Sequence, residues 1–184
     1  LWAIGVLVMA AVVLLGSLDP TQALTTVAVA AVLVGVTGAT FDIVITAPAG
    51  FEAVSNMPVV RQSVLADGRR ETAFARSPSM PTYLVALAVG EFEALTDSFD
   101  GIALRILTAP GRSHEARYAM EVTKQLLAYF RDYFGVPYML PKLDQLAIPG
   151  VRGGAMEDWG AISYNENLLL FDPTRSAPRQ QQLI

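Results

Sequence analysis

The order of apolar and polar positions from residue 41 onward predicts short strands separated by turns. Residues 41–46 begin with an alternation of apolar and polar side chains and are rich in β-branched residues, which predicts a strand. The sequence Ala66-Asp67-Gly68 predicts a hairpin turn between two strands. Further strands are predicted at residues 51–55, 69–75, 83–88 with an extension over 92–95, 102–108, 143–148 and 161–164. Short strands at this spacing indicate an antiparallel sheet or sandwich.

Residues 113–134 follow a different period and predict a helix. Ser113 is the expected N-cap, and Gly135 followed by Pro137 is expected to end the helix. An apolar stripe at helical spacing comprises Ala119, Val122, Leu126, Phe130 and Tyr133. The aromatic side chains at positions 129, 130, 133 and 134 fit either a ligand pocket or core packing, and the helical period favours core packing.

The first forty residues are apolar and contain a single charged side chain, Asp19. Residues 1–18 just reach the length of a bilayer core, and Asp19-Pro20 then predicts a turn. A shorter apolar run follows at residues 23–36, so the expectation is one membrane span with a weaker second, and a membrane location. A wrongly joined gene segment is the alternative. A secretory signal is disfavoured because no basic residue precedes Arg61.

Composition and charge exclude several classes of function. The chain carries 13 lysines and arginines scattered among 17 acidic residues, for a net charge of −4, so no basic patch for nucleic acid is expected. Cysteine is absent, which removes disulfides, thiolate metal sites and a cysteine nucleophile. His114 is the only histidine, and its place beside the expected helix start favours a surface role over metal binding.

A glycine-rich loop between the last two predicted strands contains the sequence GAMEDW at residues 154–159. This sequence resembles the exopeptidase signature G-A-M-E-N of the zinc aminopeptidases related to alanyl aminopeptidase (aminopeptidase N), of the gluzincin type. Other stretches that resemble this family occur in the same order as in the family, at residues 55–58, 80–84, 89–92, 133–138, 141–144 and 168–173. The resemblance covers about residues 39–184, which makes it far more specific than a five-residue motif alone.

The resemblance implies a strand-rich α+β fold. Residues 39–108 would be the C-terminal part of the family's N-terminal domain, an antiparallel, saddle-like β-sandwich. Residues 109–184 would be the start of a thermolysin-like catalytic domain. The apolar segment 1–38, with one or two expected helices, lies before the region of resemblance. The implied activity is hydrolysis of N-terminal residues from peptides with a free N-terminus.

The same resemblance assigns recognition of the substrate amine to Glu157. A carboxylate in a partly desolvated pocket distinguishes a free ammonium from an internal peptide by charge-assisted hydrogen bonds. Asp158 belongs to the predicted binding residues but stands where the family has Asn, so it replaces a donor by a second negative charge. The remaining predicted residues would line the path of an extended substrate: Gly153, Gly154, Ala155 and Met156. The alternative is a simple glycine-rich loop with an exposed Glu.

The zinc that the family uses is held by H-E-x-x-H and a further Glu, and the Glu inside that motif activates the zinc-bound water. The chain contains no such motif, and its only histidine is His114. We therefore expect zinc to be the cofactor of a longer protein of which this chain is an internal piece, and the piece alone to hydrolyse nothing. The alternative function, from another class, is a membrane-anchored, non-catalytic β module that binds peptides.

Overall fold

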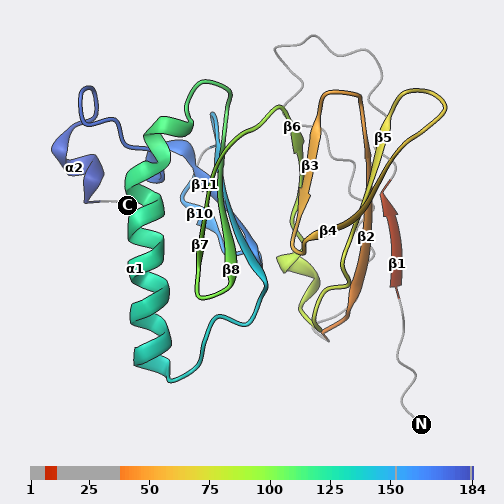
Figure 1. Cartoon of the computed structure of the whole chain (residues 1–184), viewed down its shortest axis with the longest axis horizontal. Coiled ribbons are helices and arrows are strands. Elements are labelled where there is room, and N and C mark those ends of the chain that lie inside the picture. Colours follow the sequence, from red (N-terminus) through yellow and green to blue (C-terminus); the bar gives the residue numbers. More distant parts are fainter. Residues whose placement is uncertain (1–6, 12–37, 152, 183) are drawn as a thin grey trace. The chain divides into compact units, whose positions relative to one another are not determined.

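The computed structural model describes residues 7–11, 38–151, 153–182 and 184. The chain divides into two compact units, Leu1–Glu91 and Phe92–Ile184. Both units are built on sheets, and the second adds the long helix α1 (Figure 1). The expected strand-rich α+β fold is confirmed at this level. The boundary predicted after residue 108 separates two domains of the family that the sequence resembles, not the two compact units. It stays a prediction.

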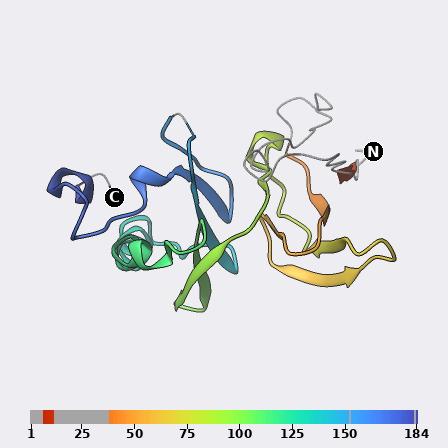
Figure 2. The same cartoon turned by 90° about the horizontal axis from the view of Figure 1, so that it is seen from above.

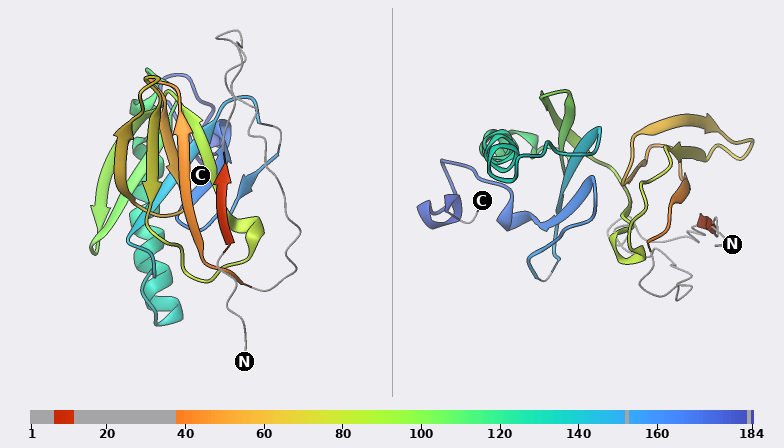
Figure 3. Two further views of the ribbon diagram at one scale, coloured as in Figure 1. Left: turned by 90° about the vertical axis from the view of Figure 1, so that its right-hand side faces the viewer. Right: turned by 90° about the horizontal axis from the view of Figure 1, so that it is seen from below.

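The first unit contains a four-stranded sheet and a two-stranded sheet in its described part. The larger sheet consists, in spatial order, of β1 (Leu7–Ala11), β2 (Phe41–Ala47), β5 (Arg70–Phe74) and β4 (Val59–Val64). Its last three strands are antiparallel neighbours, whereas β1 runs parallel to β2. The smaller sheet pairs β3 (Glu52–Ser55) with β6 (Leu87–Gly90). The expected turn at residues 66–68 is confirmed at the tip of the β4–β5 hairpin (Figure 2 and Figure 3).

Strand β2 follows the alternation that predicted it. Its buried side chains are Phe41, Ile43, Ile45 and Ala47, and the residues between them are half-buried. Burial of one large apolar side chain stabilises a fold by roughly 1.5–3 kcal/mol. This strand therefore supplies a large share of the core of the first unit.

The strand expected at residues 83–88 is wrong in its first half. Residues Thr82–Leu84 form the 3-10 helix η1, and β6 begins only at Leu87. Asn56 accounts for the difference, since its side-chain nitrogen donates to the carbonyl of Leu84 at 2.7 Å and its oxygen accepts from the amide of Ala86 at 3.0 Å. The buried Asn56 side chain thus satisfies backbone groups that a neighbouring strand would otherwise pair.

The second unit contains a five-stranded mixed sheet. Its strands, in spatial order, are β10 (Ala155–Met156), β11 (Ala161–Asn165), β9 (Lys142–Ile148), β8 (Ile102–Thr108) and β7 (Glu93–Phe99). The antiparallel arrangement expected from the sequence holds only at the two ends of this sheet, because β11, β9 and β8 are parallel neighbours. Parallel neighbours require a crossover connection, and α1 provides it between β8 and β9.

The helix begins later than the sequence predicted and ends where it predicted. A short 3-10 helix, η2 (Ser113–Ala116), precedes α1 (Arg117–Phe134). The predicted N-cap role of Ser113 is wrong, because its hydroxyl donates instead to the carboxylate of Glu93 on β7. The predicted end at Gly135 is confirmed, since this residue has a φ of 68°, in the left-handed region that glycine adopts without strain.

The buried face of α1 differs from the predicted stripe. Its buried side chains are Ala119, Met120 and Thr123, and the first two join the cluster formed with β8 and β9. Of the five stripe residues only Ala119 is buried, whereas Phe130 is 46% and Tyr133 68% exposed. The last turns of α1 extend past the ends of β7 and β8, so the sheet does not cover them (Figure 1). Core packing of these aromatic rings was therefore a wrong expectation. The rings pack on one another instead, with Tyr129 and Tyr133 centroids 5.8 Å apart.

The remaining described elements are two short helices, η3 (Glu166–Leu168) and α2 (Pro178–Gln181). The membrane helices expected in residues 1–38 fall mostly outside the described residues, and residues 7–11 form β1. Among the helices that the structure describes, none combines the length and apolar character needed to span a bilayer.

Candidate functional site

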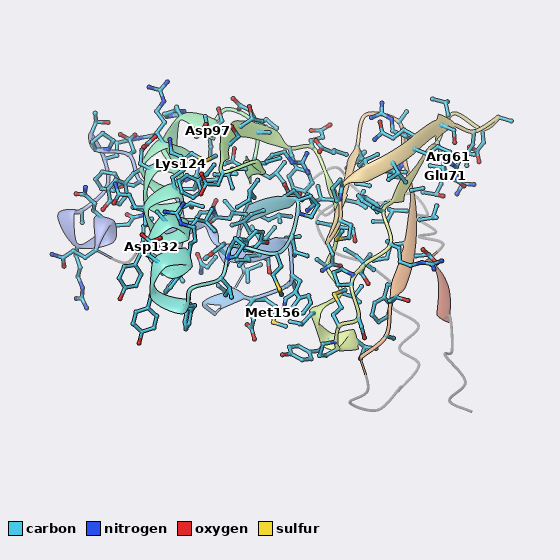
Figure 4. The ribbon with its side chains drawn as sticks, turned by 60° about the horizontal axis from the view of Figure 1, so that its bottom comes forward. Arg61, Glu71, Asp97, Lys124, Asp132 and Met156 are labelled. Carbon is cyan, nitrogen blue, oxygen red and sulfur yellow. The ribbon has the colours of Figure 1, made fainter. Side chains whose placement is uncertain are left out.

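The predicted site residues lie on one connection, the motif loop (residues 149–160), which joins β9 to β11 and contains β10. β10 forms an antiparallel hairpin with β11, in which Ala155 pairs with Tyr164 and Met156 with Ser163. Figure 4 labels Met156 on this strand. In the order of the described strands β10 is the outermost on its side of the sheet, so only one of its edges is paired.

Asn165 fixes the start of the motif. Its backbone amide donates to the carbonyl of Gly154 at 2.9 Å, and its side-chain amide donates to the carbonyl of Val151 at 2.8 Å. Between these two anchored residues Gly153 has a φ of 123°, which side-chain-bearing residues rarely adopt. Gly153 therefore turns the chain, and Gly154 presents an anchored carbonyl.

An open cavity of about 240 Å³ lies beside the hairpin. It is lined by Ile148, Val151, Gly154, Ala155, Met156, Ser163, Tyr164 and Asn165. Three of the six predicted site residues are among these, whereas Gly153, Glu157 and Asp158 are not. Pockets that enclose whole small molecules measure roughly 300–1,000 Å³, so this cavity suits part of a ligand.

The two acidic residues of the motif have opposite environments. Glu157 is exposed directly after β10, whereas Asp158 is only 8% exposed. Burial, and secondly the charge of Glu157, raise the pKa of Asp158 to about 6. Below that pH the Asp158 carboxyl is neutral and has a proton to donate, as the amide of an asparagine has.

A buried ion cluster lies on the strands next to the motif loop. Arg105 of β8 donates to both carboxylate oxygens of Asp144 on β9, at 2.8 and 2.6 Å. The Nζ atom of Lys142 donates to Asp144 at 2.8 Å and to the carbonyl of Gly160, at the end of the motif loop, at 2.6 Å. No role for these residues was predicted from the sequence. The available signal was the placement of Arg105 and Asp144 inside predicted strands, with Lys142 directly before the second strand, because buried charges require partners.

The described residues do not provide a zinc site. His114 is exposed on η2 and is the only histidine of the chain. In the part of the chain that the structure describes, no group of three or more His, Cys, Asp and Glu side chains is arranged to hold a metal ion.

Two family models match the chain, one in each unit. Residues 37–84 match the peptidase M1 N-terminal domain, and residues 118–184 match the peptidase family M1 domain. Aminopeptidase N from Acetobacter pasteurianus is 41% identical over 147 residues, which are 79% of this chain and 41% of that protein. Glutamyl aminopeptidase from Sus scrofa is 45% identical over 147 residues, 79% of this chain and 16% of that protein. Puromycin-sensitive aminopeptidase from Caenorhabditis elegans is 38% identical over 148 residues, 79% of this chain and 16% of that protein. The chain thus spans less than half the length of these relatives.

Both matching models describe domains of peptidase family M1, and the similar proteins are aminopeptidases. The chain belongs to peptidase family M1. The family resemblance drawn from residues 154–159 and the colinear stretches is confirmed.

Proposed function

We propose that this chain supplies the part of an aminopeptidase active site that binds the free N-terminus of a peptide. The observation that carries the proposal is an exposed carboxylate, that of Glu157, placed directly after the strand that lines the 240 Å³ cavity. A carboxylate binds an ammonium group through charge-assisted hydrogen bonds, which are about twice as strong as neutral ones. An acetylated N-terminus has no such charge, so Glu157 selects peptides with a free amine.

The free edge of β10 supports the same assignment. Ala155 is exposed and Met156 half-buried, and only one edge of their strand is paired among the described strands. An extended peptide adds to such an edge through main-chain hydrogen bonds. With its amine at Glu157, the peptide is held in one register, and the bond after its first residue is placed for cleavage.

The family relationship supports zinc as the cofactor of the complete enzyme. When bound, zinc polarises the scissile carbonyl and generates a nucleophile from water at neutral pH. The residues of this chain that the structure describes do not form its site. What this chain contributes is therefore the binding and orientation of the substrate amine.

The two family matches support a finer domain assignment. We infer that residues 39–108 are the later strands of a saddle-like N-terminal β domain, because a match to that domain covers residues 37–84. We infer that residues 109–184 are the start of a thermolysin-like catalytic domain, in line with the match over residues 118–184.

The hydrolysis of leucine p-nitroanilide tests the proposed function in a protein that carries this sequence together with the zinc motif. The change Glu157→Ala is expected to lower kcat/KM at least about 100-fold, because loss of the anchor misplaces the scissile bond. The matched control is Glu121→Ala on α1, whose carboxylate is 64% exposed and pairs with Lys124. A Glu157→Ala enzyme with the kcat/KM of the control would overturn the role of Glu157.

A further inference from the structure

Lys142 connects the interior of the five-stranded sheet to the motif loop. It is only 6% exposed, and its Nζ atom donates to Asp144 at 2.8 Å and to the carbonyl of Gly160 at 2.6 Å. The same carbonyl accepts the backbone amide of Asp144 at 3.0 Å. Two groups of β9 therefore hold one oxygen of the loop.

The held oxygen belongs to a tight turn that begins at Asp158, directly after Glu157. The amide of Ala161 donates to the carbonyl of Asp158 at 3.1 Å, and Gly160 has a φ of 72° inside this turn. A four-residue turn with positive φ at its third residue places few rotatable bonds between its ends. A shift of Gly160 is therefore transmitted to Asp158 and to Glu157, which precedes it.

We propose that Lys142 is a positioning residue that fixes the C-terminal end of the motif loop through the Gly160 carbonyl and thereby sets the place of the Glu157 carboxylate. This inference rests on the proposed function of Glu157 in binding the substrate amine. The other end of the loop is held independently by Asn165, at the carbonyl of Gly154. Glu157 thus lies between two anchored ends.

The cost of burying Lys142 supports a positioning role. Desolvation lowers the pKa of Lys142, and the charge of Asp144 opposes that shift. Buried ion pairs add little net stability compared with well-packed apolar residues. A contribution to stability therefore does not by itself explain a buried lysine at position 142. A charged donor does provide a strong hydrogen bond to a backbone carbonyl, which an apolar side chain cannot.

Amide hydrogen exchange in the full chain tests the loop anchor without any ligand. The measured quantity is the exchange rate of the Ala161 amide relative to that of Ile106, which lies in the core strand β8. Lys142→Met is expected to raise this ratio about tenfold or more, because the turn opens locally. Lys142→Gln keeps a donor near Gly160 and is expected to restore part of the protection. Lys124→Met, which removes an α1 lysine paired with Asp97 of β7, is expected to leave the ratio unchanged.

Binding of L-leucinamide to the same variants, followed by NMR titration, tests the consequence for Glu157. Lys142→Met is expected to weaken this binding about tenfold or more and to leave the weaker binding of N-acetyl-leucinamide unchanged. Unchanged exchange and affinity in Lys142→Met would overturn the proposal, and if that variant does not fold, the same result in Lys142→Gln would do so. A wild-type chain that binds both ligands equally would count against the proposed function instead, and the exchange ratio would still decide whether Lys142 holds the loop.

Discussion

Arg105 and Asp144 occupy paired positions on the neighbouring parallel strands β8 and β9. The guanidinium donates to the two carboxylate oxygens at 2.8 and 2.6 Å, and Asp144 is 0% exposed. Burial of a carboxylate is costly unless cations and hydrogen-bond donors surround it. Arg105 of β8 and Lys142 of β9 supply them.

Removal of the Asp144 charge is expected to destabilise the protein. Asp144→Asn leaves two cations facing a neutral amide. Removal of one partner of a buried ion pair lowers the free energy of unfolding by about 3–5 kcal/mol. Urea denaturation followed by circular dichroism measures the free energy of unfolding. Asp132→Asn, at a surface carboxylate near the end of α1 (Figure 4), is the control and is expected to leave it unchanged. A loss below about 1 kcal/mol in Asp144→Asn would contradict the described cluster.

The stability of the protein is expected to depend on the protonation of Asp158. Its folded-state pKa is raised to about 6 from the ordinary value of 3.8. The folded state therefore keeps a proton between these values that the unfolded state loses, so the stabilisation is full below pH 4 and is lost as the pH rises through 6. Relative to Asp158→Asn, which is neutral throughout, the wild type should lose about 1–2 kcal/mol between pH 4 and 7 after allowance for solvent screening. If the difference in unfolding free energy between the wild type and Asp158→Asn does not change between pH 4 and 7, the raised pKa of Asp158 is refuted.

The two faces of α1 are expected to differ in their sensitivity to truncation. Met120→Ala removes a buried side chain from the core of the second unit and should cost about 2–4 kcal/mol of unfolding free energy. Tyr133→Ala removes a ring that is 68% exposed and should cost less than about 1 kcal/mol. Thermal and urea denaturation of the two variants makes the comparison. Equal losses would mean that the aromatic end of the helix is covered.

Local sequence signals predicted the features that are determined by neighbouring residues in the chain. The alternation at residues 41–46, the turn at residues 66–68 and the helix end at Gly135 each depend on a few neighbouring residues. The start of α1 was missed because the Ser113 hydroxyl bonds to Glu93, which is distant in the sequence, and does not cap the helix. The parallel order of β8, β9 and β11 was missed for a related reason, since strand direction depends on the connections, which are α1 between β8 and β9 and the motif loop between β9 and β11.

The site was predictable to the extent that it is one continuous segment. The amino-acid sequence of residues 154–158 resembles a family motif, and the structure places three of these residues at one cavity. The contact between Lys142 and Gly160 joins residues 18 positions apart and depends on the pairing of β9 with β11. No local pattern encodes such a register, so only the folded structure reveals this anchor.

The proposed binding of a free N-terminal amine by Glu157 is tested by comparing the affinity of the chain for L-leucinamide with its affinity for N-acetyl-leucinamide. NMR titration of the wild type is expected to give tighter binding of the free amine, by about tenfold or more, because a hydrogen bond to a charged group contributes about 1.5–3 kcal/mol. Glu157→Gln should abolish this preference and leave the acetylated ligand unaffected, while Glu121→Gln keeps the preference. An unchanged preference in Glu157→Gln would contradict the account.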